Sequence, residues 1–126
     1  MACFRQFEQR PHPSRYPASM MMFELLTQNA LLDTELLRKN DQLGDIFTIA
    51  REVDFAFETG DRQRADDFAE FVNGKSYGTA AARKLADGRF QVLVLITMPI
   101  TQHLIGCVSG FMLCLSRLFQ IEYLGW

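Results

Sequence analysis

Two carboxylates on one predicted strand are the first residues in this chain that could perform chemistry. Asp54 and Glu58 lie four positions apart in the alternating segment 52–58, so they share one face of a strand. At about 3.3 Å of rise per residue they stand about 13 Å apart. Paired carboxylates that hydrolyse glycosidic bonds lie closer together than this. The spacing therefore indicates surface acids, without the geometry of a general acid and base.

The cysteines and histidines show no spacing that would bind a metal or form a disulfide. Cys107 and Cys114 are seven residues apart in a helical pattern, so the helical rise alone separates them by about 10 Å. A disulfide needs a shorter distance between Cα atoms. His12 and His103 have no neighbours at ligand spacing. We therefore expect no metal, no cofactor, no enzyme activity and a reducing, cytoplasmic environment.

The charge pattern argues against nucleic acid and membranes as partners. The formal net charge is −2, whereas broad binding to a phosphate backbone needs clustered Lys and Arg. Phe90 to Ser116 is a run of 27 residues without Asp, Glu, Lys or Arg, and a bilayer-spanning helix needs about 20 apolar residues. However, Thr97, Pro99 and Gln102 interrupt the run. We interpret it as a buried strand followed by a buried helix.

The length of 126 residues predicts one domain preceded by an extension. Residues 1–19 contain three prolines and lack the apolar segment of a secretory signal. We expect this stretch to be largely disordered. Residues 20–126 form the domain.

The elements that must position these side chains follow from periodicity and turn residues. We expect a helix first, then strand, helix, two strands, helix and strand, over residues 20–40, 52–58, 61–74, 77–85, 90–97, 101–119 and 121–126. From about residue 51 this is the βαββαβ order of a ferredoxin-like sandwich. The predicted fold is therefore α+β and ferredoxin-like, with an additional N-terminal helix. Residues 53–57 and 92–96 form its central strands, and 121–126 lies at an edge beside the first strand.

Apolar spacing also predicts which helix faces are buried. For the N-terminal helix the predicted apolar face consists of Phe23, Leu26, Ala30 and Leu37, with Leu31 beside them, and is widened by Leu25, Leu32 and Leu36. For the last helix they are Leu104, Cys107, Val108, Phe111, Leu115 and Leu118. The opposite side of the last helix carries the small residues Gly106, Ser109 and Gly110. We expect the N-terminal helix to cover them, with a partner chain as the alternative.

The aromatic residues after the last helix are candidates for partner binding. Strict alternation places Tyr123 and Gly125 on one face, and Glu122, Leu124 and Trp126 on the other. Aromatic side chains are enriched among binding hot spots. The alternative is that Tyr123 packs in the core and Trp126 covers a sheet edge.

These segments resemble the family of ribonuclease E inhibitors known as regulator of ribonuclease E activity B. The resemblance covers roughly residues 22–126. It lies in the first strand Arg51–Phe57, in the Phe-Ala pair of the helix segment Ala65–Ala69 and in the closing segment Phe119–Trp126. Leu124 stands where the family usually has Asp, and this chain lacks the strong acidity of the best-known members.

The resemblance implies a small non-catalytic protein that binds and inhibits ribonuclease E by protein–protein contact. The candidate contact residues are Asp54, Glu58, Glu122, Tyr123 and Trp126. The alternative function is a ferredoxin-like module that senses a small molecule or forms a homodimer, with Leu93 and Leu95 as an apolar interface. Neither reading involves direct contact with nucleic acid.

Overall fold

The computed structural model describes residues 20–126, which form a mixed α+β domain. The prediction of disorder for residues 1–19 lies outside the described residues. The elements are α2 (Met22–Gln42), β1 (Arg51–Thr59), α3 (Arg62–Gly74), β2 (Thr79–Lys84), β3 (Phe90–Met98), α4 (Gln102–Leu118) and β4 (Glu122–Gly125). Each of the seven predicted elements is thus confirmed in type and in approximate position.

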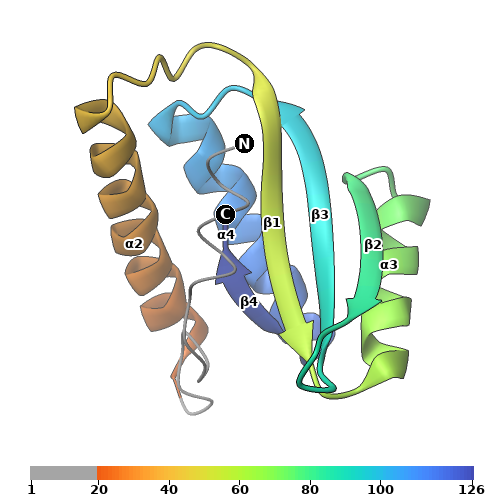
Figure 1. Ribbon diagram of the computed structural model, residues 1–126. Coiled ribbons are helices and arrows are strands. Elements are labelled where there is room, and N and C mark those ends of the chain that lie inside the picture. Colours follow the sequence, from red (N-terminus) through yellow and green to blue (C-terminus); the bar gives the residue numbers. More distant parts are fainter. Residues whose placement is uncertain (1–19) are drawn as a thin grey trace.

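The strands form a four-stranded antiparallel sheet in the order β2-β3-β1-β4. This order confirms the two central strands and places β4 at an edge beside β1. Figure 1 shows α3 and α4 behind the sheet, with α2 beside α4. The helices therefore cover one face of the sheet.

The core lies between the sheet and the helices, and β1 supplies its centre. Val53, Phe55 and Phe57 are fully buried on the helix side of the sheet. The Phe57 ring lies 4.5 Å from that of Phe68 on α3 and 5.1 Å from that of Tyr123 on β4, centroid to centroid. Since fully burying such a side chain is worth about 1.5–3 kcal/mol, this cluster ties the edge strand to the centre of the domain.

The side chain of Asp61 caps the start of α3. The Asp61 carboxylate accepts hydrogen bonds from the backbone N–H groups of Gln63 and Arg64. It thereby satisfies donors that the first turn of a helix leaves unpaired. The acid at this helix start therefore has a structural role as a cap.

The predicted centre of the buried face of α2 is wrong in all but one position, whereas Leu25 and Leu36, which were expected to widen that face, are buried. Leu37 is buried, but Phe23 and Leu31 are 79% and 65% exposed. The residues that α2 does bury are Leu25, Asn29, Asp33, Leu36 and Leu37. Two of these are polar, so a search for apolar periodicity could not identify the face.

The predicted stripe of α4 is wrong for the same reason. Leu115 is buried as predicted, whereas Leu104, Phe111 and Leu118 are 42%, 40% and 77% exposed. The buried residues are Ile105, Ser109, Met112, Leu113, Leu115 and Ser116. The small-residue side of α4 therefore faces inward at Ser109, where α2 covers it as expected. At Gly106 an added Cβ would meet no atom within 4 Å.

Candidate protein-binding surface

The acids of β1 point to the sheet face opposite the helices. Glu52, Asp54 and Glu58 alternate with the buried apolar residues of the strand. The predicted division of β1 into two faces is therefore confirmed. Glu52 is exposed, but Asp54 and Glu58 are only 3% and 5% exposed. In this conformation Glu52 alone of the three offers its carboxylate freely to a partner.

Burial changes the proton affinity of Asp54. Removal from water raises the pKa of the Asp54 carboxyl above its usual value, and the like charge of Glu52 adds to the rise. The folded protein therefore favours the protonated acid more than the unfolded chain does. At neutral pH the ionised carboxylate costs stability, and this cost disappears as the pH falls through the folded-state pKa.

We expect Asp54→Asn to raise the free energy of unfolding at neutral pH, because the variant buries no charge at this position. The gain should shrink as the pH falls through the folded-state pKa of Asp54, where the wild type is itself neutral. Urea denaturation of both proteins across the acidic range measures this difference. Glu52→Gln is the matched variant and should lower the Asp54 pKa. If the gain in the free energy of unfolding did not depend on pH, the raised pKa of Asp54 would not be its cause.

A polar row crosses the whole sheet near the start of β4. Neighbouring strands pair Arg83 with Gln91, Gln91 with Glu58, and Glu58 with Glu122. Arg83 Nε donates to Gln91 Oε1 at 2.8 Å. Arg89 Nη2 lies 3.6 Å from Glu122 Oε2, and both side chains are about one third exposed. Glu58 and Glu122 lie directly opposite each other, where like charges repel. The positive charge of Arg89 beside Glu122 reduces this repulsion.

A bulge in β4 corrects the predicted alternation of the closing segment. Phe57 pairs with Tyr123, but the next residue back along β1, Ala56, pairs with Gly125, so Leu124 is an extra residue. Gly125 has φ +100°, a backbone conformation that glycine adopts without strain. Because of the extra residue, each later side chain points to the sheet face opposite the one that strict alternation predicts. Trp126 therefore turns to the helix side, and the prediction that it shares a face with Glu122 is wrong.

Tyr123 and Trp126 instead join a buried polar network that connects β4, α2 and α4. Trp126 Nε1 donates to Asp33 Oδ1 at 3.1 Å. Asn29 Nδ2 donates to Asp33 Oδ2 at 3.2 Å and to Ser109 Oγ at 3.0 Å. Ser109 Oγ and the Tyr123 hydroxyl are 2.8 Å apart. All five side chains are at most 3% exposed.

Three members of this network are not predicted from the sequence: Asn29, Asp33 and Ser109. The available signal was the spacing of Asn29 and Asp33, which are four residues apart in a helical pattern and so lie on one face. Buried polar groups are nearly always hydrogen-bonded. A lone Trp and a Tyr near a helix carrying that pair are suitable partners, since each has a polar group to satisfy.

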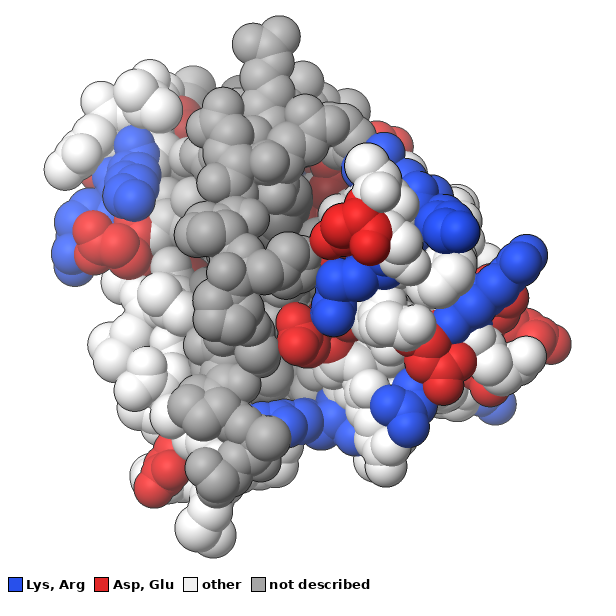
Figure 2. All heavy atoms as spheres, turned by 60° about the horizontal axis from the view of Figure 1, so that its bottom comes forward, with Lys and Arg blue, Asp and Glu red and all other residues white. Residues whose placement is uncertain are grey.

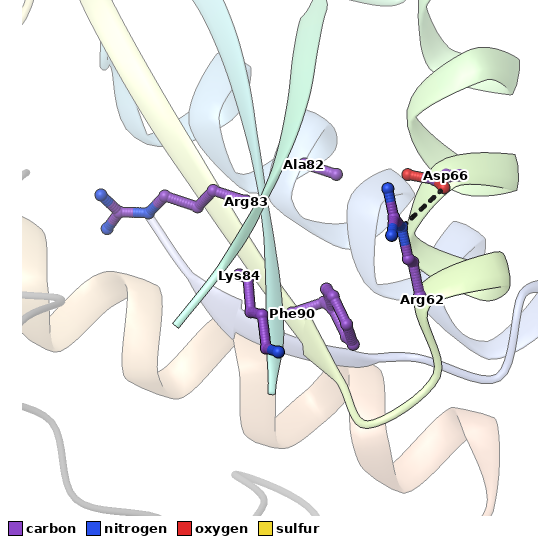
Figure 3. A pocket seen from close by; sticks show the side chains of 6 residues that line it. All are labelled: Arg62, Asp66, Ala82, Arg83, Lys84 and Phe90. Atoms are coloured by element: carbon purple, nitrogen blue, oxygen red, sulfur yellow. Dashed lines mark ion pairs between the residues drawn. The ribbon is translucent and has the colours of Figure 1, made fainter. Parts of the chain in front are cut away.

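A small cleft lies between the start of α3 and the β2–β3 hairpin. Arg62, Asp66, Lys84 and Phe90 line it, while Figure 3 shows the side chain of Arg83 directed away. Arg62 Nε lies 3.7 Å from Asp66 Oδ2. The volume of about 190 Å³ is below the roughly 300–1,000 Å³ of typical ligand pockets. The cleft therefore gives little support for a small-molecule site.

The described residues contain no group of three or more His, Cys, Asp or Glu that could hold a metal ion. Within residues 20–126, no helix has the length and apolar character that crossing a bilayer requires. On the face shown in Figure 2, charges of both signs are interleaved on the right, and a smaller group of both signs lies at the upper left. The described residues on this face therefore show no extended patch of one sign.

Comparison with known families gives a match over most of the domain. The model of the family described as Regulator of ribonuclease activity B matches residues 32–126. These residues include the second half of α2 and every later element. No curated protein matches the chain.

Proposed function

Because this chain belongs to the family Regulator of ribonuclease activity B, we propose that it is a non-catalytic regulator that binds a ribonuclease and lowers its activity. The proposed target is ribonuclease E, and the proposed consequence is slower RNA turnover. The family match over residues 32–126 carries this proposal. We further propose that the protein acts in the cytoplasm without a cofactor.

Four of the five candidate residues would serve this contact, in two ways. Glu122 is partly exposed, so we assign it, with exposed Glu52, to direct contact. Asp54 and Glu58 are buried on the same sheet face, and Tyr123 and Trp126 are buried on the other. We assign Glu58, Tyr123 and Trp126 to holding β1 and β4 in place, and Asp54 to neither role, because its ionised carboxylate costs stability. Acidic contacts of this kind would steer the protein to a basic region of the ribonuclease.

Reversing the charge of Glu122 is expected to weaken inhibition. Glu122→Lys should raise the concentration for half-maximal inhibition of purified ribonuclease E by about tenfold, which corresponds to about 1.4 kcal/mol of binding. Glu122→Gln should cause a smaller loss, because it removes attraction without adding repulsion. RNA cleavage assays measure both.

Glu70→Lys is the matched control, since Glu70 is exposed on α3. Thermal unfolding of each variant would show whether the loss of the Arg89 ion pair disturbs the fold. Inhibition unchanged by Glu122→Lys would remove this residue from the contact. Absence of binding by the wild type would overturn the proposed target.

We also propose the finer description of the fold as ferredoxin-like, supported by the βαββαβ order after α2 and by the strand order. Proteins with this fold have many different functions. A small-molecule sensor or a homodimerisation module is therefore the alternative function. Leu93 and Leu95 are half-buried, and the cleft lined by Phe90 is small. A ligand-dependent rise in melting temperature would favour the sensor.

A further inference from the structure

The middle of one sheet face is buried, although the described helices pack against the other face. We call the side of the sheet opposite α3 and α4 the open sheet face. Three residues of β1 on this face are at most 5% exposed: Asp54, Ala56 and Glu58. Gln91, which pairs with Glu58, is 6% exposed. The outer face of an antiparallel sheet is commonly in contact with water, so burial at these positions indicates that another part of the chain covers them.

The buried positions form a narrow stripe along β1. Glu52 and its partner Thr97, at the start of the strand, are exposed. On β2 the residues that share this face are also exposed: Thr79, Ala81 and Arg83. The cover is thus limited to the middle of the sheet, as a single extended segment would give. Because the stripe is buried in one copy of the chain, a second copy is not needed to cover it.

Residues 1–19 are long enough to reach this stripe and to follow it. In Figure 1, α2 begins at the same end of the domain as the end of β1. Met20, which follows the segment, is half-buried and packs against the core. A segment of 19 residues spans up to about 60 Å when extended. The 9 residues of β1 span about 30 Å, so the segment is long enough to run along the whole strand.

The charges of the segment and of the open sheet face are complementary. The segment contains three arginines and one acid: Arg5, Arg10, Arg15 and Glu8. Its net charge of +2 leaves −4 for residues 20–126. Four acids lie on the open sheet face, with Arg83 and Arg89 beside them: Glu52, Asp54, Glu58 and Glu122. Opposite charges of this kind favour association and determine its orientation.

The segment also has apolar side chains for the middle of the stripe. Leu93 and Leu95 pair with Ala56 and Asp54, and both leucines are half-buried on the open sheet face. Burial is the main cause of the raised pKa of Asp54, which fits apolar neighbours at this point. Phe4 and Phe7 are three residues apart in the segment, and burying such side chains is favourable.

We propose that residues 1–19 bind the open sheet face of the same chain along β1. The arginines would lie near the acids of this face, and the phenylalanines near Leu93 and Leu95. The alternative is the disordered extension expected from the sequence. The proposal does not depend on the ribonuclease function, since Glu52 and part of Glu122 stay accessible. The segment lies outside the residues 32–126 that the family model matches, so the proposal concerns this chain in particular.

A spin label on Cys3 tests the position of the segment in the full chain. Cys107→Ser and Cys114→Ser remove the other two cysteines, and thermal unfolding checks that the fold is retained. A bound segment should cause the amide signals of Ala56 and Leu93 to lose most of their NMR intensity. The signal of Glu70, which is exposed on α3, should stay sharp. Broadening limited to residues next to Met20, as a free segment would give, would overturn the proposal.

Reversing the charges of the segment tests how it is recognised. Arg5→Glu, Arg10→Glu and Arg15→Glu together should restore most of the lost intensity at Ala56 and Leu93. The matched control makes the same change of charge at exposed positions on the helices: Lys39→Glu, Arg62→Glu and Lys75→Glu. It should leave the broadening unchanged. Broadening that persists in the segment variant would contradict recognition by charge.

A mixed sample separates the segment of the same chain from that of a second copy. Spin-labelled protein without nitrogen-15 is mixed with unlabelled protein that carries nitrogen-15. Only contacts between different molecules broaden signals in this sample. Sharp signals at Ala56 and Leu93 would support binding within one chain. Loss of these signals would overturn the proposal, because the cover would then come from another molecule.

Discussion

Replacing Trp126 with alanine is expected to lower the free energy of unfolding by about 3–5 kcal/mol, the usual cost of removing a buried large aromatic side chain. The side chain is 1% exposed, so its removal leaves a cavity. The substitution also removes the Nε1–H that Asp33 accepts, and an unsatisfied buried acceptor adds to the cost. Urea denaturation followed by circular dichroism measures the change.

Trp126→Phe separates the two contributions. Phenylalanine keeps much of the buried ring surface but cannot donate to Asp33. We expect a loss of about 1–3 kcal/mol, the cost of one unsatisfied buried group. If Trp126→Ala folded with wild-type stability, Trp126 would be a surface residue in solution. In that case its assignment to holding β4 would fail, and a direct role in partner contact would become the better explanation.

The sequence predicted the elements of this fold well because each has a local cause. The alternation of β1, the acid at the start of α3 and the apolar run of β3 each act over a few residues. The central strands could also be predicted, because few sheet topologies are compatible with this order of strands and helices along the chain. Residues 53–57 and 92–96 are therefore central in the structure, as predicted.

The facing of Trp126 could not be predicted, because one added residue in β4 reverses it. Leu124 is the extra residue, and Gly125 adopts the positive φ that follows it. The only sign of a bulge in an alternating sequence is a glycine. A glycine in a strand can also indicate a sharp bend or the close approach of another backbone. The consequence is functional: a residue expected on the partner surface with Glu122 is instead buried against α2.

The helix faces could not be predicted because hydrogen bonds between distant residues determine them. Asn29 and Ser109 are 80 positions apart in sequence and 3.0 Å apart in the structure. Their polar side chains occupy the inward sides of α2 and α4, which leaves Phe23 79% exposed and Phe111 packed against the ring of Tyr77. The burial of the polar network and the exposure of Phe23 thus both follow from the rotation of α2 about its axis.

Asp33 joins α2 to Trp126 through the buried hydrogen-bond network. Its loss should therefore disturb the position of α2 more than the loss of any other residue of this helix. Asp33→Ala is expected to lower the free energy of unfolding by about 2–4 kcal/mol, because the buried N–H of Trp126 loses its acceptor and Asn29 loses one of its acceptors. Asp41→Ala is the control, since Asp41 is exposed on the same helix. Denaturant unfolding of the two variants gives the comparison.

Asp33→Asn refines the test, because it keeps one acceptor for Trp126 but turns an amide donor toward that of Asn29. We expect an intermediate loss of about 1–2 kcal/mol. A double-mutant cycle of Asp33→Asn with Trp126→Phe should then show coupling of at least about 0.5 kcal/mol, as groups in one hydrogen-bond network do. Additive losses would mean that the two side chains are independent in solution, and that α2 is held on the domain by its apolar contacts alone.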